Sequence, residues 1–438
     1  SPSGTACATS LVNGTSRSVS STPGRAPATT TDVTSTFAVH ADRLDVVVAA
    51  EMAGLDRSTV LDTIERLDTA VAAIDGQGFT PTPFGPQSAL AEAIGLDGAD
   101  LWVKDETGNV SGSHKGRHLF GVALGLALTE TQPERLAIAS CGNAAFAASV
   151  VAAAVDQPLE VFVPDWADQA ITDRIAAHGA TVVRTERDPD RLGDPAYHAM
   201  VDAIAAGATA FSCQGTDTPG TVDGGRTIAY EMLETLGDHR LDRLVIQVGG
   251  GALGSAVVSG LQRELGDTAM PVINAVQPEG NYPLVVAWNR LAAELGDRAP
   301  TTNAERATAA KRFGRVPAEP RRAMLARLAA DHDRYMAPWP TEPASYATGI
   351  LDDITYDWLP IVDGMLATGG FPLVATDDDF RAAHRLGHTH TSIPVCPTGA
   401  AGLGGLLALR RDVAPDLAGE RIALVFSGHQ RPGDPVPS

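Results

Sequence analysis

The chain has 438 residues, of which 44 % are hydrophobic and 20 % charged, and its formal net charge is −20. This composition is typical of a globular enzyme with a large core, and the negative charge argues against nucleic acid or an anionic membrane as partner. No apolar run approaches the roughly 20 residues that span a bilayer. The widely spaced cysteines suggest neither a metal site nor a disulfide framework, which favours a reducing cytoplasm. They are Cys7, Cys141, Cys213 and Cys396.

Residues 1–36 are rich in Ser, Thr, Ala and Gly and contain few large apolar side chains, so we expect a disordered leader. Helical patterns follow at residues 45–51 and 58–73, and Ser58 is an acceptable start for the second helix. A proline-rich turn at 80–86 precedes another expected helix at 88–94.

From residue 101 to residue 276, short β-branched runs alternate with alanine-rich helical stretches. Alternation of this kind predicts an α/β fold whose parallel sheets carry helices on both faces, with the active residues in loops after the strands. The predicted strands are residues 101–104, 136–139, 159–163, 181–184, 244–248 and 272–276.

Residues 285–345 change character, because Arg, Ala and Pro dominate and no strand pattern is present, which predicts a helical insertion. The next stretch, residues 345–358, contains Tyr346, Tyr356 and Trp358. These aromatic residues either pack in the core or line a substrate pocket, and we favour packing. The α/β pattern resumes with strands at 372–375 and 422–426.

The stretch from 105 to 118 leads from a strand through a Ser/Gly turn into an apolar helix at 119–128, and Lys115 falls at the start of that helix. The positive end of the helix dipole and the neighbouring Arg117 favour a neutral amine, which imine formation with an aldehyde cofactor requires. A solvated lysine is the ordinary alternative, and three further motifs weigh against it. The other two lysines of the chain are Lys104 and Lys311.

A second motif, at 139–145, follows a predicted strand and combines small residues with Asn143. Its backbone amides suit an anion at a helix N-terminus, and Asn143 can hold both a ring oxygen and a carboxylate. An ordinary turn between strand and helix is the alternative interpretation.

The third and fourth motifs also precede helices. Gly249, Gly251 and Gly254 fit a G-x-G-x-x-G phosphate loop, and Glu279 at the end of the next strand keeps a dinucleotide ligand open. Thr398 opens a Gly/Ala-rich turn, where it is either a neutral hydroxyl at the edge of a flat ligand or a helix N-cap.

Taken together and in this order, the four motifs resemble the fold-type II pyridoxal-phosphate enzymes, the superfamily of the tryptophan synthase β subunit, threonine synthase and threonine dehydratase. Residues 111–115, Ser-Gly-Ser-His-Lys, look like the Schiff-base segment of tryptophan synthase β, while residues 103–107 and 223–231 are similar to threonine synthase. The similarity runs from about residue 79 to the C-terminus. The chain departs from threonine synthases in the Gly-Arg-His after Lys115 and in Ala144.

The resemblance implies a two-domain enzyme that carries pyridoxal 5′-phosphate (PLP) as an imine on Lys115, which is also the expected catalytic base. His114 would help to hold the phosphate. The implied cofactor-binding residues are His114, Lys115, Asn143, Gly249, Gly250, Gly251, Ala252, Leu253, Gly254 and Thr398. The implied substrate-binding residues are Ser140, Cys141, Gly142, Asn143 and Ala144.

The resemblance further implies a small domain at 116–225 and a large PLP-binding domain built from 37–115 and 226–438, in a homodimer that acts on a small-molecule amino acid. A hydroxyl such as that of Thr398 cannot hold a full positive charge on the ring nitrogen, which favours β-elimination or β-replacement on a hydroxy, acetoxy or phospho-oxy amino acid. Two alternatives stay open: a PLP-binding protein without turnover, and a nicotinamide-dependent oxidoreductase that uses the glycine loop.

Overall fold

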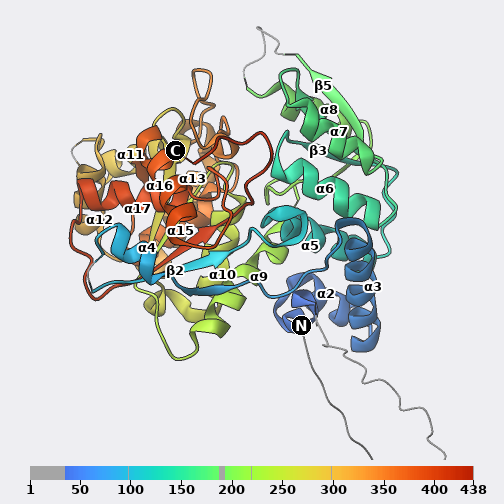
Figure 1. Ribbon diagram of the computed structural model, residues 1–438, viewed down its shortest axis with the longest axis horizontal. Helices are drawn as coiled ribbons and strands as arrows, with labels where there is room; N and C mark the ends of the chain where they lie inside the picture. Colours follow the sequence, from blue (N-terminus) through green and yellow to red (C-terminus); the bar gives the residue numbers. More distant parts are fainter. Residues whose placement is uncertain (1–34, 97, 187–192, 219, 297, 438) are drawn as a thin grey trace, which may run out of the picture. The chain divides into compact units, whose positions relative to one another are not determined.

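The computed structural model describes residues 35–96, 98–186, 193–218, 220–296 and 298–437 (Figure 1). Most of the expected leader lies outside the described residues. Ser35 and Thr36 are buried, and Thr36 begins helix α1 (Thr36–Val39), so these two residues belong to the folded part rather than to a leader.

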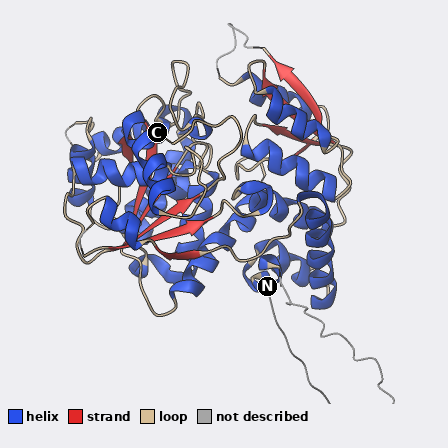
Figure 2. Ribbon diagram, in the orientation of Figure 1, coloured by secondary structure: helices blue, strands red, loops and turns tan. Residues whose placement is uncertain are grey.

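The larger sheet has six strands in the order β1-β2-β10-β7-β8-β9, and only the edge strand β1 is antiparallel. Its helices lie on both sides of the strands, as the sequence predicted (Figure 2). The strands are β1 Phe84–Pro86, β2 Asp100–Asp105, β7 Arg243–Gln247, β8 Val272–Pro278, β9 Leu373–Ala375 and β10 Arg421–Phe426.

The smaller sheet is entirely parallel, with four strands in the order β5-β4-β3-β6. All four strands fall within residues 116–225, and the division of the chain into a small and a large domain stays a prediction. The strands are β3 Leu136–Ala139, β4 Leu159–Pro164, β5 Thr181–Thr185 and β6 Thr209–Ala210. Strands β1 and β6 were not predicted, because β1 contains Gly85 and Pro86, which indicate a turn, and β6 has only two residues and shows no period.

Helices connect the parallel strands, and their positions agree with the sequence pattern. The start of α3 differs from the prediction: Asp56, not Ser58, is the N-cap, and its carboxylate accepts a hydrogen bond from the Thr59 amide. Before the insertion the other long helices are α2 Asp45–Met52, α3 Arg57–Asp75, α4 Ser88–Ala93, α5 Lys115–Leu128, α6 Asn143–Ala154, α7 Gln169–Ala177, α8 Pro195–Ala205, α9 Gly220–Leu236 and α10 Ala252–Ala269.

The predicted insertion consists of helices, and no strand occurs in the described residues between 283 and 345. Its helices are α11 Pro283–Glu294, α12 Asn303–Phe313, α13 Ala318–Ala330 and α14 His332–Tyr335. The chain then returns to the sheet through α15 Trp358–Thr368, α16 Asp377–His390 and α17 Ala401–Asp412. None of the described helices is both long enough and apolar enough to cross a bilayer.

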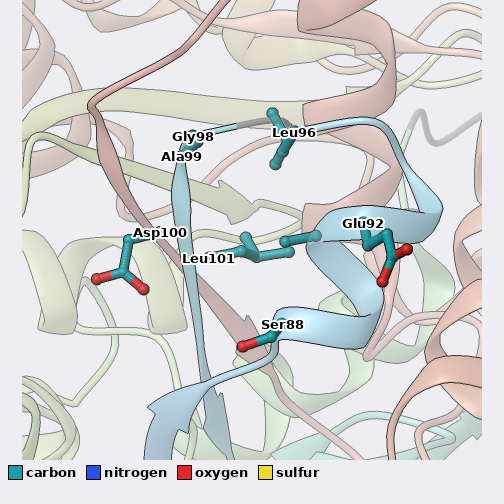
Figure 3. Close-up of a pocket in the computed structure, with 8 residues that line it drawn as sticks. Ser88, Glu92, Leu96, Gly98, Ala99, Asp100 and Leu101 are labelled. Carbon is teal, nitrogen blue, oxygen red and sulfur yellow. The ribbon is translucent and has the colours of Figure 1, made fainter.

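A small cavity of about 200 Å³ lies between α4 and the amino end of β2 (Figure 3). Asp100 of β2 lines this cavity, and its carboxylate forms an ion pair with the Arg421 guanidinium at 2.8 Å. Three of the motifs lie instead after the carboxyl ends of β2, β3 and β7, the edge at which parallel sheets collect their ligands. The fourth, at Thr398, lies between α16 and α17, and the Cys396 amide there donates to the Gly428 carbonyl just after β10. The candidate site is therefore at that edge.

Candidate active site

Lys115 is the first residue of α5 and is half-buried. The chain reaches it from β2 through a tight turn, the 3₁₀ helix Val110–Gly112, in which Ser111 has a left-handed φ of 61°. The Asn109 side chain accepts a hydrogen bond from the Val110 amide at 2.8 Å and so helps to hold this turn. The sequence prediction for the helix start is confirmed.

Behind Lys115, two cations and two carboxylates form a buried ionic cluster. The Arg117 guanidinium donates to Glu106 at 2.8 Å and to Glu231 at 2.6 Å, and Lys104 also pairs with Glu231. Burial by itself would raise the pKa of Glu231, but Arg117 and Lys104 outweigh it and hold that pKa below its ordinary value. Arg117 therefore forms buried ion pairs with Glu106 and Glu231. Its position close to Lys115 in the sequence did not indicate this role.

His114 precedes Lys115 and is buried. Its Nδ1 lies 3.1 Å from the Ser427 carbonyl oxygen, and its ring contacts His118. Burial and then the charge of Lys115 lower the pKa of His114 well below its usual value, so the ring is neutral. These contacts are with the end of β10 and with α5, while His114 Nε2 is buried without a partner among the described residues, and help from His114 in holding a phosphate stays a prediction.

The glycine loop joins β7 to α10. Gly251 has a left-handed φ of 101° and is the N-cap of α10, while Ala252, Leu253 and Gly254 form its first turn. A Cβ atom added to Gly249 would lie 2.4 Å from Asp352 Oδ2 and 2.8 Å from Ile350 Cα. Position 249 therefore requires glycine, because another segment of the chain approaches it closely. The sequence motif alone did not indicate this requirement.

That other segment is residues 348–357, which we call the strap. The Gly349 amide donates to Thr398 Oγ1 at 2.9 Å, and the Asp357 amide donates to the Gly250 carbonyl at 3.0 Å. The Asp357 carboxylate also accepts hydrogen bonds from the amides of Gly215 and Thr216. The strap thus contacts the glycine loop, Thr398 and a turn after β6.

The expectation that the aromatic residues around the strap serve packing is only partly right. Tyr346 and Trp358 are buried, with 8 % and 1 % exposure, so packing is confirmed for them. Tyr356 is half-buried instead, and its Cδ2 lies 3.2 Å from the position of a Cβ on Gly250. It also contacts the Tyr197 ring of α8, so it lines the glycine loop.

The expected asparagine loop, residues 140–144, is half-buried, and Asn143 begins α6. Asn143 Nδ2 lies 2.9 Å from the position of a Cβ on Gly428, whereas Asn143 Oδ1 is buried without a partner among the described residues. Burial, followed by the charge of Asp194, raises the pKa of Cys141 to about 11, so this thiol stays protonated at neutral pH. The loop therefore offers amides and one amide side chain, not a thiolate.

The sequence left open whether Thr398 is a helix N-cap, and the structure shows that it is not. Ala400 is the N-cap of α17, and no side chain caps that helix end. The Thr398 hydroxyl oxygen accepts the Gly349 amide, which leaves the hydroxyl proton free for another acceptor. Gln247, at the end of β7, supports this turn by donating to the Gly399 carbonyl and to Ser427 Oγ.

These motifs lie together at the carboxyl edge of the sheets. Ser113 pairs with Gly428, and Gly428 in turn contacts Asn143. On the other side, the charge of Lys115 acts on the Asp352 and Asp357 carboxylates of the strap. Lysine, asparagine loop, glycine loop and threonine turn therefore surround one location, although their individual roles stay predictions.

Glu279, which kept a dinucleotide ligand open, lies elsewhere. Its carboxylate accepts a hydrogen bond from the Asp377 amide at the start of α16, at 3.2 Å. This contact gives Glu279 a structural partner at a helix N-terminus, where a carboxylate is stabilised by the helix dipole.

Comparison with known proteins agrees with this arrangement. The sequence model of the family described as "Pyridoxal-phosphate dependent enzyme" matches residues 76–341. Threonine synthase of Methanocaldococcus jannaschii is 23 % identical over 356 residues, which are 80 % of this chain and 74 % of that protein.

Two solved structures are similar in fold. The processed form of threonine deaminase isoform 2 from Solanum lycopersicum superposes with a TM-score of 0.59 at 17 % identity, and the match covers 86 % of this chain and 91 % of that one. Maize serine racemase superposes with a TM-score of 0.58 at 16 % identity, and the match covers 85 % of this chain and 93 % of that one. At such identities the likeness establishes the fold and not the reaction.

Proposed function

Because the chain belongs to the family of pyridoxal-phosphate dependent enzymes, we propose that it catalyses β-elimination or β-replacement on a hydroxy, acetoxy or phospho-oxy amino acid. Membership of this family argues against the alternative function, a nicotinamide-dependent oxidoreductase. The observation that carries the reaction type is the neutral Thr398 hydroxyl, held by the Gly349 amide. The threonine synthase and threonine deaminase similarities support the substrate class.

The residues present fit PLP. The glycine loop ends at the N-terminus of α10, which no side chain caps, and backbone amides at a helix N-terminus suit a phosphate oxygen. Asn143 Oδ1 is buried and unpaired among the described residues, ready for a polar group of a ligand. In this proposal Lys115 holds the aldehyde carbon, the amides of the glycine loop hold the phosphate, Asn143 bonds the ring hydroxyl oxygen, and Thr398 faces the ring nitrogen.

When bound, PLP withdraws electrons from the Cα of an amino acid and acidifies its Cα–H bond. Lys115 Nζ would accept that Cα proton as the general base. The amides of the Ser140–Ala144 loop and the N-terminus of α6 bind the substrate carboxylate. The protein thus contributes substrate binding and proton transfer.

A spectral and product screen tests the proposal. Purified protein is mixed with serine, threonine, their O-phospho and O-acetyl forms and homoserine phosphate. We expect a change in visible absorbance with at least one of them, together with release of its β substituent, or of the γ-phosphate in the case of homoserine phosphate, as a free product. A protein that binds PLP and all these amino acids without releasing product would instead be the PLP-binding protein without turnover.

Replacing Thr398 with aspartate is expected to shift the reaction from elimination towards transamination. A carboxylate favours the protonated ring nitrogen, which strengthens the ring as an electron sink, whereas the threonine hydroxyl leaves it neutral. The measurement is the ratio of eliminated product to pyridoxamine phosphate plus keto acid, with Thr398→Ser as the control that keeps the hydroxyl. An unchanged ratio in Thr398→Asp would contradict the role of Thr398.

Replacing Gly250 with valine is expected to weaken PLP retention before it unfolds the protein. An added Cβ would lie 3.2 Å from Gln214 Nε2 and from Tyr356 Cδ2, so a larger side chain obstructs the approach of a ligand to the loop amide. The measurement is the PLP content of folded protein after dialysis, beside the midpoint of thermal unfolding. Gly85→Val, on the edge strand β1 where nothing lies within 4 Å of an added Cβ, controls for the general effect of replacing a glycine whose φ is not left-handed. Full PLP content in folded Gly250→Val would mean that the loop is only structural.

A further inference from the structure

The strap brings a carboxylate to the glycine loop. Asp352 Oδ2 lies 2.4 Å from the position of a Cβ on Gly249, and Asp352 Oδ1 lies 3.3 Å from the position of a Cβ on Gly250, so this carboxylate packs against the loop backbone. The hydrogen bonds of Gly349 and Asp357 anchor the strap on both sides of Asp352. The carboxylate is therefore held at the backbone amide that opens the phosphate loop.

The surroundings of Asp352 leave it balanced between its two protonation states near pH 6. Burial raises the pKa of Asp352 to about 6, opposed by the positive charge of Lys115 and by the Gly250 amide. Asp194 at the start of α8 and the adjacent Asp353 disfavour the charged form. The phenol of Tyr356 and the thiol of Cys141 also lie within reach of its charge.

A phosphate group and an ionised Asp352 compete for the same position. Both are anions that accept hydrogen bonds from an amide, and the Gly250 amide has a single proton to donate. Two like charges at one site disfavour each other, so one of them has to leave or become neutral. Asp352 can do either, because it is half-buried and can turn away from the loop or take up a proton.

We propose that Asp352 is a built-in competitor for the glycine loop, so that the cofactor phosphate binds tightly only when Asp352 is protonated or displaced. This proposal rests on the proposed function, since it takes the glycine loop as the phosphate site. In this proposal the strap regulates how tightly the protein binds its cofactor. In particular, the affinity for PLP decreases as pH rises and Asp352 becomes charged.

The test compares the wild type with Asp352→Asn, which keeps the shape and removes the charge. Sulfate is the first probe, because it stays a dianion between about pH 5.5 and pH 8, and its dissociation constant is measured by thermal shift. For the wild type we expect sulfate binding to be roughly tenfold to hundredfold weaker at pH 8 than at about pH 5.5, because affinity follows the fraction of neutral Asp352. For Asp352→Asn we expect similar affinities at both pH values.

The second probe is PLP itself at pH 8, with its dissociation constant taken from visible absorbance. Asp352→Asn is expected to bind PLP roughly tenfold to hundredfold more tightly than the wild type. Asp353→Asn is the matched control, because it removes a neighbouring charge of the strap without removing the carboxylate at Gly250. Asp352→Ala is a second variant, which is expected to show the same gain if Asn distorts the strap.

The outcomes separate this proposal from the proposed function. If the wild type and Asp352→Asn bind PLP equally well and with the same pH dependence, the competition is wrong while the enzyme proposal stands. An equal gain in Asp353→Asn would show that total charge matters and would overturn the specific contact. Failure of both proteins to bind PLP would overturn both proposals.

Discussion

Replacing Lys115 with alanine is expected to abolish covalent attachment of PLP and to reduce activity by roughly 10³-fold or more. Lys115 provides a half-buried amine at the point where the four motifs meet. The measurements are the visible absorbance of the purified variant and peptide mapping of the wild type after borohydride reduction. The reduced adduct should map to Lys115.

The other two lysines provide unequal controls. Lys311 is exposed on α12, so Lys311→Ala is expected to keep both the absorbance and the stability of the wild type. Lys104 is fully buried and pairs with Glu231, so its replacement by alanine would lower stability for reasons unrelated to the cofactor. A reduced adduct on Lys104 or Lys311 would contradict the assignment of Lys115.

Replacing Arg117 with methionine is expected to reduce the free energy of unfolding by about 3–5 kcal/mol, because it leaves two buried carboxylates with a single cation. Arg117 has no exposed surface and makes hydrogen bonds to Glu106, Glu231 and Thr227. The measurement is urea unfolding at neutral pH. Since Arg117 follows Lys115 closely in the first turn of α5, we also expect weaker PLP retention in the folded fraction.

The matched control for Arg117→Met is Arg322→Met. Arg322 pairs with Glu319 on the surface of α13, where the two side chains are 66 % and 84 % exposed. Exposed pairs contribute less than about 1 kcal/mol, so this variant should unfold nearly as the wild type does. A loss in Arg117→Met no larger than that of the control would show that the buried cluster contributes little to stability.

The sequence by itself determined the fold class and the places where chemistry occurs. Strands such as β3 (Leu136–Ala139) and the helix start at Lys115 were predictable because β-branched runs, apolar periods and Gly/Ser turns act within a few residues. The insertion was predictable for the same reason, since its Arg, Ala and Pro content excludes strands locally. Local chemistry also placed the four motifs in the turns that precede helices.

Only the tertiary structure decided which distant side chains meet at the site. Asp352 lies about 100 positions from Gly250 in the chain, and Glu231 more than 100 from Arg117, so no local pattern relates them. The same distance explains why Thr398 was left open between a cap and a ligand contact, because its partner is Gly349. Parallel sheets bring the carboxyl ends of strands from remote parts of the chain to one edge. The pairing of charges there depends on that packing, because burial and proximity are properties of the folded chain.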